Sequence, residues 1–141
     1  MRLWHYKLIP VLPNAMLVSQ WRECIAIKRQ WEKGALKHRL VSYVMEHDRV
    51  YFGTYVKNVC RELTHRKINY NDNLYYELTS FSDVSYLNIG ISNINYEEHN
   101  DRYLKQCYYN LQEKADRGII TKEEWELIHK NIYGLIKSEV E

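Results

Sequence analysis

Proline, the residue that most strongly interrupts helices, occurs in this chain only near its start, at Pro10 and Pro13. Only five glycines occur in the 141 residues. Because folds with many tight turns need many glycines and prolines, so sparse a set favours long helices over a β fold. Proline also restricts the backbone of the residue before it, so we expect residues 1–13 to form an irregular arm.

Apolar residues recur at the spacing of a helix face in four later segments. These segments are 14–32, 49–66, 100–116 and the stretch that starts at Thr121. Pro13 and Gly34 suit the entrance and exit of the first helix, Asn100 suits the cap of the third, and Thr121 to Glu124 form a capping-box pattern. The residues expected to face the core are Leu17, Trp21, Cys24, Lys28 and Trp31; Phe52, Val56, Val59 and Leu63; Leu104, Cys107, Tyr108 and Leu111; and Trp125, Ile128, Ile132 and Leu135.

Residues 67–99 show no such period and are rich in Asn, Ser and Tyr. We expect a loop there with one or two short helices. The whole pattern predicts an all-α fold, a single-domain bundle of about four helices with the irregular N-terminal arm. The length suits one helical domain over residues 1–141.

The charges are divided between a basic half, residues 1–70, and an acidic half, residues 71–141. The basic half carries thirteen Lys and Arg against five Asp and Glu, a net charge of +8, and the acidic half carries seven against thirteen, a net charge of −6. A basic half suits a polyanionic partner, although two halves that attract each other would look the same. Its densest basic cluster is Lys33, Lys37, His38 and Arg39.

Several classes of protein are excluded by features that the sequence lacks. It has no apolar run long enough to cross a membrane and no signal-peptide pattern at its start, so we expect a cytoplasmic protein without membrane contact. The isolated residues Cys24, Cys60 and Cys107 fit buried thiols in a reducing compartment, and we expect neither disulfides nor a metal site. No P-loop, dinucleotide fingerprint or Ser/His/Asp set occurs, so no cofactor is expected.

Trp21, Arg22 and Glu23 follow one another in the first expected helix and point in different directions. Trp21 belongs to the apolar stripe, whereas Glu23 shares another face with Ser19 and Ile27. An adjacent Arg and Glu are most often a solvated surface pair, so these three residues alone do not indicate a site.

A wider pattern around this triplet resembles the start of the pyrimidine-dimer DNA glycosylases of the endonuclease V type. The residues that carry the resemblance are Met1-Arg2-Leu3-Trp4, Leu12-Pro13, Leu17 and Trp21-Arg22-Glu23. The basic cluster after Lys33-Gly34 and the segment from Arg49 to Asn69 are similar to later parts of that family, so the likeness covers about the first seventy residues. A bacterial subgroup of the family also shares the stretches 5–10 and 101–111.

The resemblance implies a DNA glycosylase that is also an abasic-site lyase and acts on damaged double-stranded DNA as a monomer. In such an enzyme an α-amine attacks C1′ of the damaged nucleotide and forms an imine, after which β-elimination cuts the strand. The implied catalytic residues are Met1 through its amine, Glu23 as the acid/base carboxylate, and Arg22 at a phosphate. The implied nucleic-acid-binding residues are Arg2, Lys28, Arg29, Lys33, Lys37, His38 and Arg39.

The chain departs from the family pattern at four places. The best-known members expose a threonine amine where this chain has Met1 followed by Arg2, and they carry a histidine where it has Met16. Their arginine three residues after the glutamate is Ala26 here, and their aromatic C-terminal tail has no match in residues 138–141. Lys28 or Arg29 could supply the charge missing at residue 26.

Two other functions stay open at this stage. The chain could be a non-catalytic nucleic-acid-binding module of the same fold, or an interaction factor whose acidic half mimics nucleic acid. Exposed tyrosines could stack on bases, and Tyr75 and Tyr76 are the candidates, whereas Tyr55 and Tyr108 occupy core-like helical positions.

Overall fold

The computed structural model describes residues 1–84 and 94–140, and these residues form helices and no strand. The elements are the 3-10 helices η1 (Tyr6–Val11) and η2 (Ser42–Glu46) and the α-helices α1 (Asn14–Glu32), α2 (Arg49–His65), α3 (Asp72–Phe81), α4 (Asp101–Asp116) and α5 (Lys122–Val140). The all-α prediction is confirmed for the described residues. α3 is the short helix expected between 67 and 99, and Tyr86 of that segment lies outside the described residues.

The predicted helix caps are confirmed by their hydrogen bonds. The backbone N–H of Tyr103 donates to Asn100 Oδ1 at 2.9 Å at the start of α4. At the start of α5 the N–H of Glu124 donates to Thr121 Oγ1 at 3.1 Å, and the N–H of Thr121 donates to Glu124 Oε1 at 2.8 Å. This reciprocal pair satisfies amides that the helix itself leaves without acceptors.

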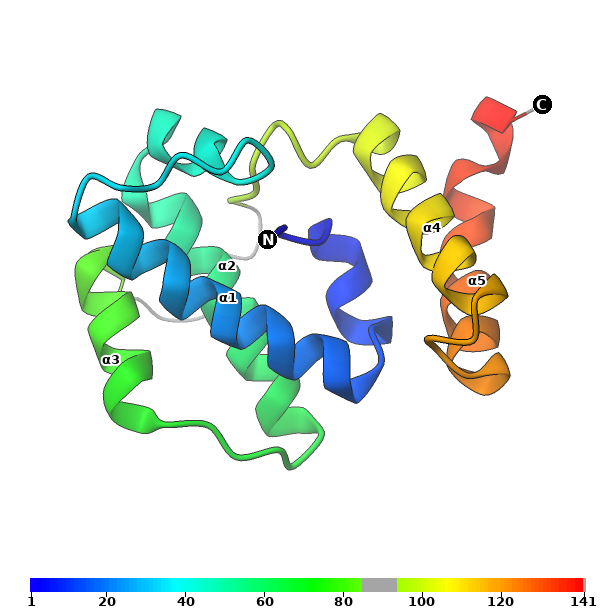
Figure 1. Ribbon diagram of the computed structural model, residues 1–141, viewed down its shortest axis with the longest axis horizontal. Helices are drawn as coiled ribbons and strands as arrows, with labels where there is room; N and C mark the ends of the chain where they lie inside the picture. The colour runs from blue at the N-terminus through cyan, green and yellow to red at the C-terminus, as the bar shows by residue number, and fades with distance from the viewer. Residues whose placement is uncertain (85–93, 141) are drawn as a thin grey trace.

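The helices form two groups with the N-terminal segment between them (Figure 1). α1, α2 and α3 enclose one hydrophobic cluster, and α4 and α5 pack on each other and enclose a second. The arm contributes to both clusters, since Leu3 and Ile9 lie in the first and Leu8, Val11 and Leu12 in the second. The N-terminal segment is therefore part of the core and joins its two halves.

The arm was expected to be irregular, and this is wrong for Tyr6–Val11, which forms η1. The His5 ring accepts a hydrogen bond from the N–H of Lys7 at 3.1 Å, and the carbonyl of His5 accepts one from Leu8 at 2.9 Å. A short 3-10 helix depends on few backbone N–H donors, so it accommodates Pro10, which has no backbone N–H.

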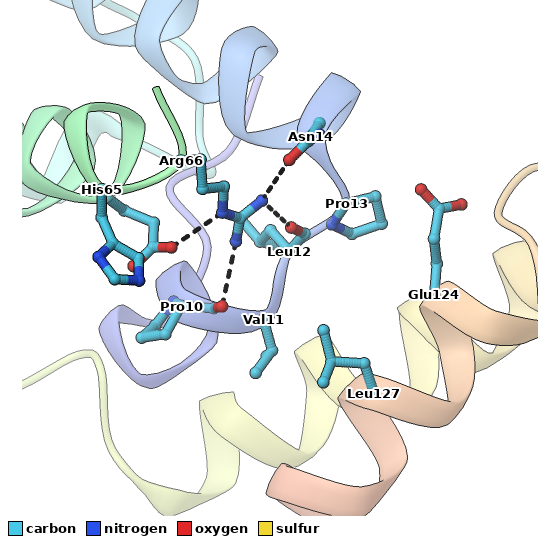
Figure 2. A pocket seen from close by; sticks show the side chains of 10 residues that line it. Pro10, Val11, Leu12, Pro13, Asn14, His65, Arg66, Glu124 and Leu127 are labelled. Atoms are coloured by element: carbon cyan, nitrogen blue, oxygen red, sulfur yellow. Dashed lines mark hydrogen bonds and ion pairs between the residues drawn. The ribbon is translucent and has the colours of Figure 1, made fainter. Parts of the chain in front are cut away.

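Arg66, just beyond α2, fixes the end of η1 (Figure 2). Its guanidinium donates to the carbonyl of Leu12 at 2.6 Å, to the carbonyl of Pro10 at 3.1 Å and to Asn14 Oδ1 at 2.9 Å. Glu62 accepts a further bond from Arg66 Nε at 2.8 Å. The pocket of about 420 Å³ beside this arginine lies between the arm, the end of α2 and α5.

The predicted core positions of α1, α2 and α4 are confirmed apart from the half-buried Trp31. In α5, Ile128 and Ile132 are buried as expected and Trp125 is half-buried against the same cluster, but Leu135 is 50% exposed and Ile136 is buried instead. α5 contacts its neighbours along one narrow stripe, and residues four apart lie over one another on a helix, so the stripe continues from Ile132 to Ile136. No described helix has the length and apolarity that crossing a membrane requires.

Gly53 lies inside α2 at the place where the chain after α3 comes closest. A Cβ on Gly53 would lie 2.6 Å from the Cβ of Ser82 and in overlap with the side chain of Val84, whereas a Cβ on Gly134 of α5 would have no neighbour within 4 Å. Gly53 therefore permits the close contact between α2 and the segment after α3, and Gly134 has no such role.

We predict opposite effects for alanine at these two glycines. Gly53→Ala should lower the free energy of unfolding by about 1–3 kcal/mol because α2 and the segment after α3 must move apart. Gly134→Ala should raise it by up to about 1 kcal/mol because alanine is the better helix former. Urea unfolding followed by circular dichroism measures both, and an unchanged or higher stability of Gly53→Ala would contradict the close packing.

Candidate active site

Glu23 points from α1 toward the N-terminal arm and is half-buried. Its Oε2 accepts hydrogen bonds from the backbone N–H of Arg2 at 3.0 Å and from Gln20 Nε2 at 3.2 Å. Arg22, the adjacent residue, is exposed. The two residues are therefore not a surface pair, since their side chains leave the helix in different directions and only the carboxylate contacts the arm.

Gln20 makes the closest contacts between α1 and the arm, and the sequence analysis missed it. Its Nε2 donates to the carbonyl of Arg2 at 2.8 Å, and its Oε1 accepts from the N–H of Trp4 at 2.8 Å. The Tyr55 hydroxyl of α2 lies 2.6 Å from the carbonyl of Trp4 and 3.0 Å from Gln20 Oε1. The sequence feature that could have indicated this role is the position of Gln20, three residues before Glu23 and at the edge of the apolar stripe.

These contacts fix the position of the chain's first residue. Met1 is half-buried and packs against the cluster of α1 to α3. Its amine is one residue from the N–H that donates to Glu23, and covalent geometry limits that separation to about 4 Å. The amine therefore lies within about 7 Å of the carboxylate.

A pocket of about 170 Å³ opens beside Glu23. It is lined by Trp4 of the arm, by Met16, Ser19, Gln20 and Glu23 of α1, and by Lys114 of α4. The four residues of α1 lie one helical turn apart, so they form one face, and the expected alignment of Glu23 with Ser19 is confirmed. Lys114 could not be found from the sequence, because nothing local relates it to the arm.

Arg2 lies partly buried against the second group of helices. Its guanidinium carbon is 5.3 Å from the centroid of the Trp4 ring, which is within the range of a cation–π contact. The hydroxyl of Tyr103 in α4 donates to the carbonyl of Leu3 at 2.6 Å, and burial raises the pKa of this phenol. The arm is thus held by α4 as well as by α1.

The predicted nucleic-acid-binding residues separate into two sets. Those on the last turn of α1 and in the loop after it are exposed: Arg29, Lys33, Lys37, His38 and Arg39. Lys28 is instead buried, and its Nζ lies 2.8 Å from Glu32 and 3.5 Å from Glu77. The hydrogen bond that Lys28 donates to Glu32 raises the pKa of Lys28. The structure therefore places Lys28 between α1 and α3, away from the exposed cations.

Two buried histidines contact each other, His5 in the arm and His99 in the segment before α4. His99 Nε2 lies 2.7 Å from the hydroxyl of Tyr43, and the rings of His99 and His5 are stacked with centroids 5.5 Å apart. Burial lowers the pKa of His99 to about 3 and that of His5 to about 4. Both rings are therefore neutral at pH 7 and serve packing.

The burial of four tyrosines bears on their predicted roles. Tyr55 and Tyr108 are buried in the core, as expected. Tyr76 is 61% exposed on α3, and Tyr75 beside it is half-buried. The suggested stacking of bases on these two residues stays a prediction.

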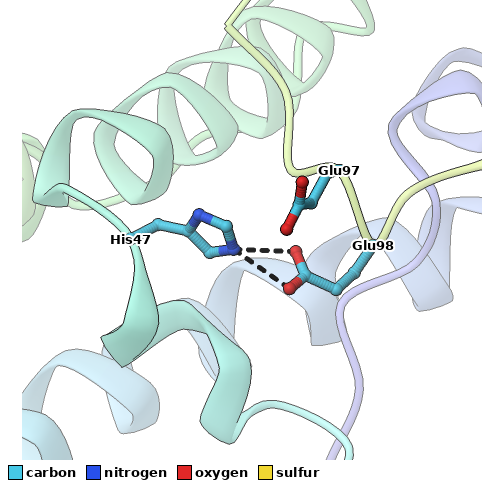
Figure 3. Close-up of side chains that lie close together, drawn as sticks. All are labelled: His47, Glu97 and Glu98. Carbon is cyan, nitrogen blue, oxygen red and sulfur yellow. Dashed lines mark hydrogen bonds and ion pairs between the residues drawn. The ribbon is translucent and has the colours of Figure 1, made fainter.

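His47, Glu97 and Glu98 form a cluster whose ligand atoms all lie within 4.8 Å of one another (Figure 3). His47 Nε2 is 2.8 and 3.0 Å from the two carboxylate oxygens of Glu98. The His47–Glu98 pair ties the segment before α4 to the segment before α2.

Comparison with known proteins gives one match. A family model described as pyrimidine dimer DNA glycosylase matches residues 1–76. No curated protein and no solved structure matches the chain. The matched region contains the arm, Gln20, Glu23 and all of α1 and α2, whereas α4 and α5 lie outside it.

We predict that Gln20→Met destabilises the protein by about 2–4 kcal/mol, although the two side chains are similar in size. The substitution leaves the buried N–H of Trp4 and the carbonyl of Arg2 without this partner, and such losses cost about 1–3 kcal/mol each. Gln30→Met on the same helix is the matched control and should change stability little. Thermal unfolding of the three proteins tests this, and equal stabilities would contradict the role of Gln20.

Proposed function

This chain belongs to the pyrimidine dimer DNA glycosylase family, which its first 76 residues match, and we propose that it excises a damaged pyrimidine from double-stranded DNA and then cuts the strand as a lyase. The observation that carries the proposal is the hydrogen bond from the N–H of Arg2 to Glu23, because it fixes the start of the chain beside a carboxylate. A neutral amine is a nucleophile, and α-amines are neutral at neutral pH more often than lysine side chains are.

In the proposed reaction the Met1 amine forms a bond to C1′ while the bond from C1′ to the base breaks. The base leaves with the electron pair of that bond and takes up a proton, which the attacking nitrogen has lost. The bond from C1′ to the ring oxygen O4′ then breaks, O4′ takes up a proton, and the nitrogen forms a double bond to C1′, which gives the protonated imine. The imine acidifies the C2′ proton, and removal of this proton expels the 3′ phosphate. Each step needs a proton donor or acceptor within reach of C1′ and C2′.

Glu23 suits that role. Its Oε2 is engaged by the arm and by Gln20, whereas among the described residues no donor reaches its Oε1. One oxygen therefore orients the carboxylate while the other is available beside the pocket. A carboxylate there also stabilises positive charge that develops on the sugar as the base leaves.

The exposed cations at the end of α1 and in the following loop support binding to DNA. We propose that Arg22, Arg29, Lys33, Lys37, His38 and Arg39 contact phosphates, and that Arg2 contributes from the arm. Such contacts orient a duplex without reading its sequence. These residues equally suit a binding module of the same fold that lacks the chemistry, and this is the second candidate function.

Borohydride trapping separates the two functions. We predict that borohydride, which reduces an imine to a stable amine, links the protein to duplexes that carry an abasic site or a cyclobutane thymine dimer, with the adduct on the peptide that contains Met1. Protein whose α-amine has been acetylated is the control and should give none. An adduct with the abasic duplex alone would contradict dimer excision. If neither duplex gives an adduct, the non-catalytic binding module becomes the favoured function.

Glu23→Gln tests the carboxylate separately from the amine. The amide keeps an oxygen that can accept from the N–H of Arg2, so the fold and DNA binding should persist. We predict that strand cutting falls by about 100-fold or more, the usual contribution of an acid/base group. Glu126→Gln, at an exposed position of α5, should cut like the wild type. Undiminished cutting by Glu23→Gln would show that another group transfers the proton.

A further inference from the structure

The pocket beside Glu23 includes a cation from the part of the chain that the family model does not match. Lys114 lies near the end of α4 and lines the pocket opposite the face of α1 that carries Glu23. The pocket is therefore completed by the second half of the chain, although that half is acidic overall.

Lys114 has no charge partner among the residues that the structure describes. It forms no ion pair with Glu23 or with any other carboxylate of the described residues. Its neighbour Glu113 lies 3.6 Å from Arg117 instead, at the surface. Lys28 shows the contrast, since two carboxylates surround its ammonium. A half-buried lysine that lines a pocket and has no carboxylate partner among these residues is available to an anionic ligand.

We propose that Lys114 binds a phosphodiester oxygen of the strand that carries the attacked nucleotide, an inference that rests on the proposed function. A nucleotide whose C1′ lies between the Met1 amine and Glu23 brings a phosphate to either side of the pocket. Arg22 is exposed on α1 next to Glu23, and Lys114 lies on α4, so the strand passes between cations from two helix groups. An ammonium offers three donors to such an oxygen.

The alternative role for a lysine here is to attack C1′ itself. Lysine side chains are ordinarily protonated at neutral pH and then have no free electron pair. An α-amine is ordinarily the weaker base of the two kinds of amine, and the contacts of Arg2 and Trp4 fix the position of the chain's first residue. Phosphate binding uses the ordinary protonated form of a lysine, so it is the role that we assign to Lys114.

The experiment measures binding to a duplex that contains a tetrahydrofuran abasic-site analogue, which cannot form an imine, from 0.05 to about 0.2 M salt. Each phosphate contact contributes about 0.9 to the slope of log affinity against log salt. We predict that Lys114→Gln binds about tenfold more weakly at low salt and has a slope shallower by about 0.9, and that Lys114→Arg restores both. Lys130→Gln, at an exposed position of α5, is the control and should behave like the wild type.

The outcomes distinguish this inference from the proposed function. An unchanged slope in Lys114→Gln, or the same loss in Lys130→Gln, would overturn the phosphate contact whatever the enzyme's activity. A borohydride adduct that maps to Lys114 would also overturn it. If Lys114→Gln has the predicted shallower slope but the wild type gives no borohydride adduct, the phosphate contact is supported and the proposed glycosylase and lyase chemistry is contradicted. If the wild type does not bind the duplex, both the phosphate contact and the proposed function are contradicted.

Discussion

The burial of the N-terminal backbone is the constraint on which the rest of this structure depends. A chain terminus is ordinarily solvated, because its peptide groups have no regular partners. Here the peptide groups of Arg2 and Trp4 enter the core, and the side chains of Gln20, Tyr55 and Glu23 replace the water that they lose. Each contact comes from a helix, so the arm has one fixed position, and the first residue has one fixed position with it.

The arm also joins the two halves of the core. Leu3 and Leu8 enter different hydrophobic clusters, and Arg66 and Tyr103 bond the carbonyls of the arm from α2 and α4. The residues that fix the amine therefore also stabilise the fold, and neither α4 nor α1 alone would determine where the amine lies. In the proposed reaction, where the α-amine of Met1 is the nucleophile, this coupling would provide the preorganisation that a side chain on a rigid element otherwise supplies.

The division of charge along the sequence is only partly reproduced in space. Nine Lys and Arg of the basic half are exposed, and four of them, Arg29, Lys33, Lys37 and Arg39, lie at the end of α1 and in the loop after it. The acidic half contributes α4 and α5 to the core, and at the pocket it contributes Lys114, which has no ion-pair partner among the described residues. Net charge over half a chain therefore says little about a single position, because the contribution of Lys114 depends on where α4 lies.

The sequence by itself determined the helices and the direction of Glu23. The ranges of α1, α2, α4 and α5 follow from spacing and capping residues, which act within a few residues and so can be read locally. Only the tertiary structure decided which side chains meet. It buried Lys28 between two carboxylates and exposed Leu135. It also gave Gln20 its three partners on the arm and α2, and it brought Lys114 to the pocket. These outcomes depend on contacts between segments far apart in sequence, whose geometry no local period encodes.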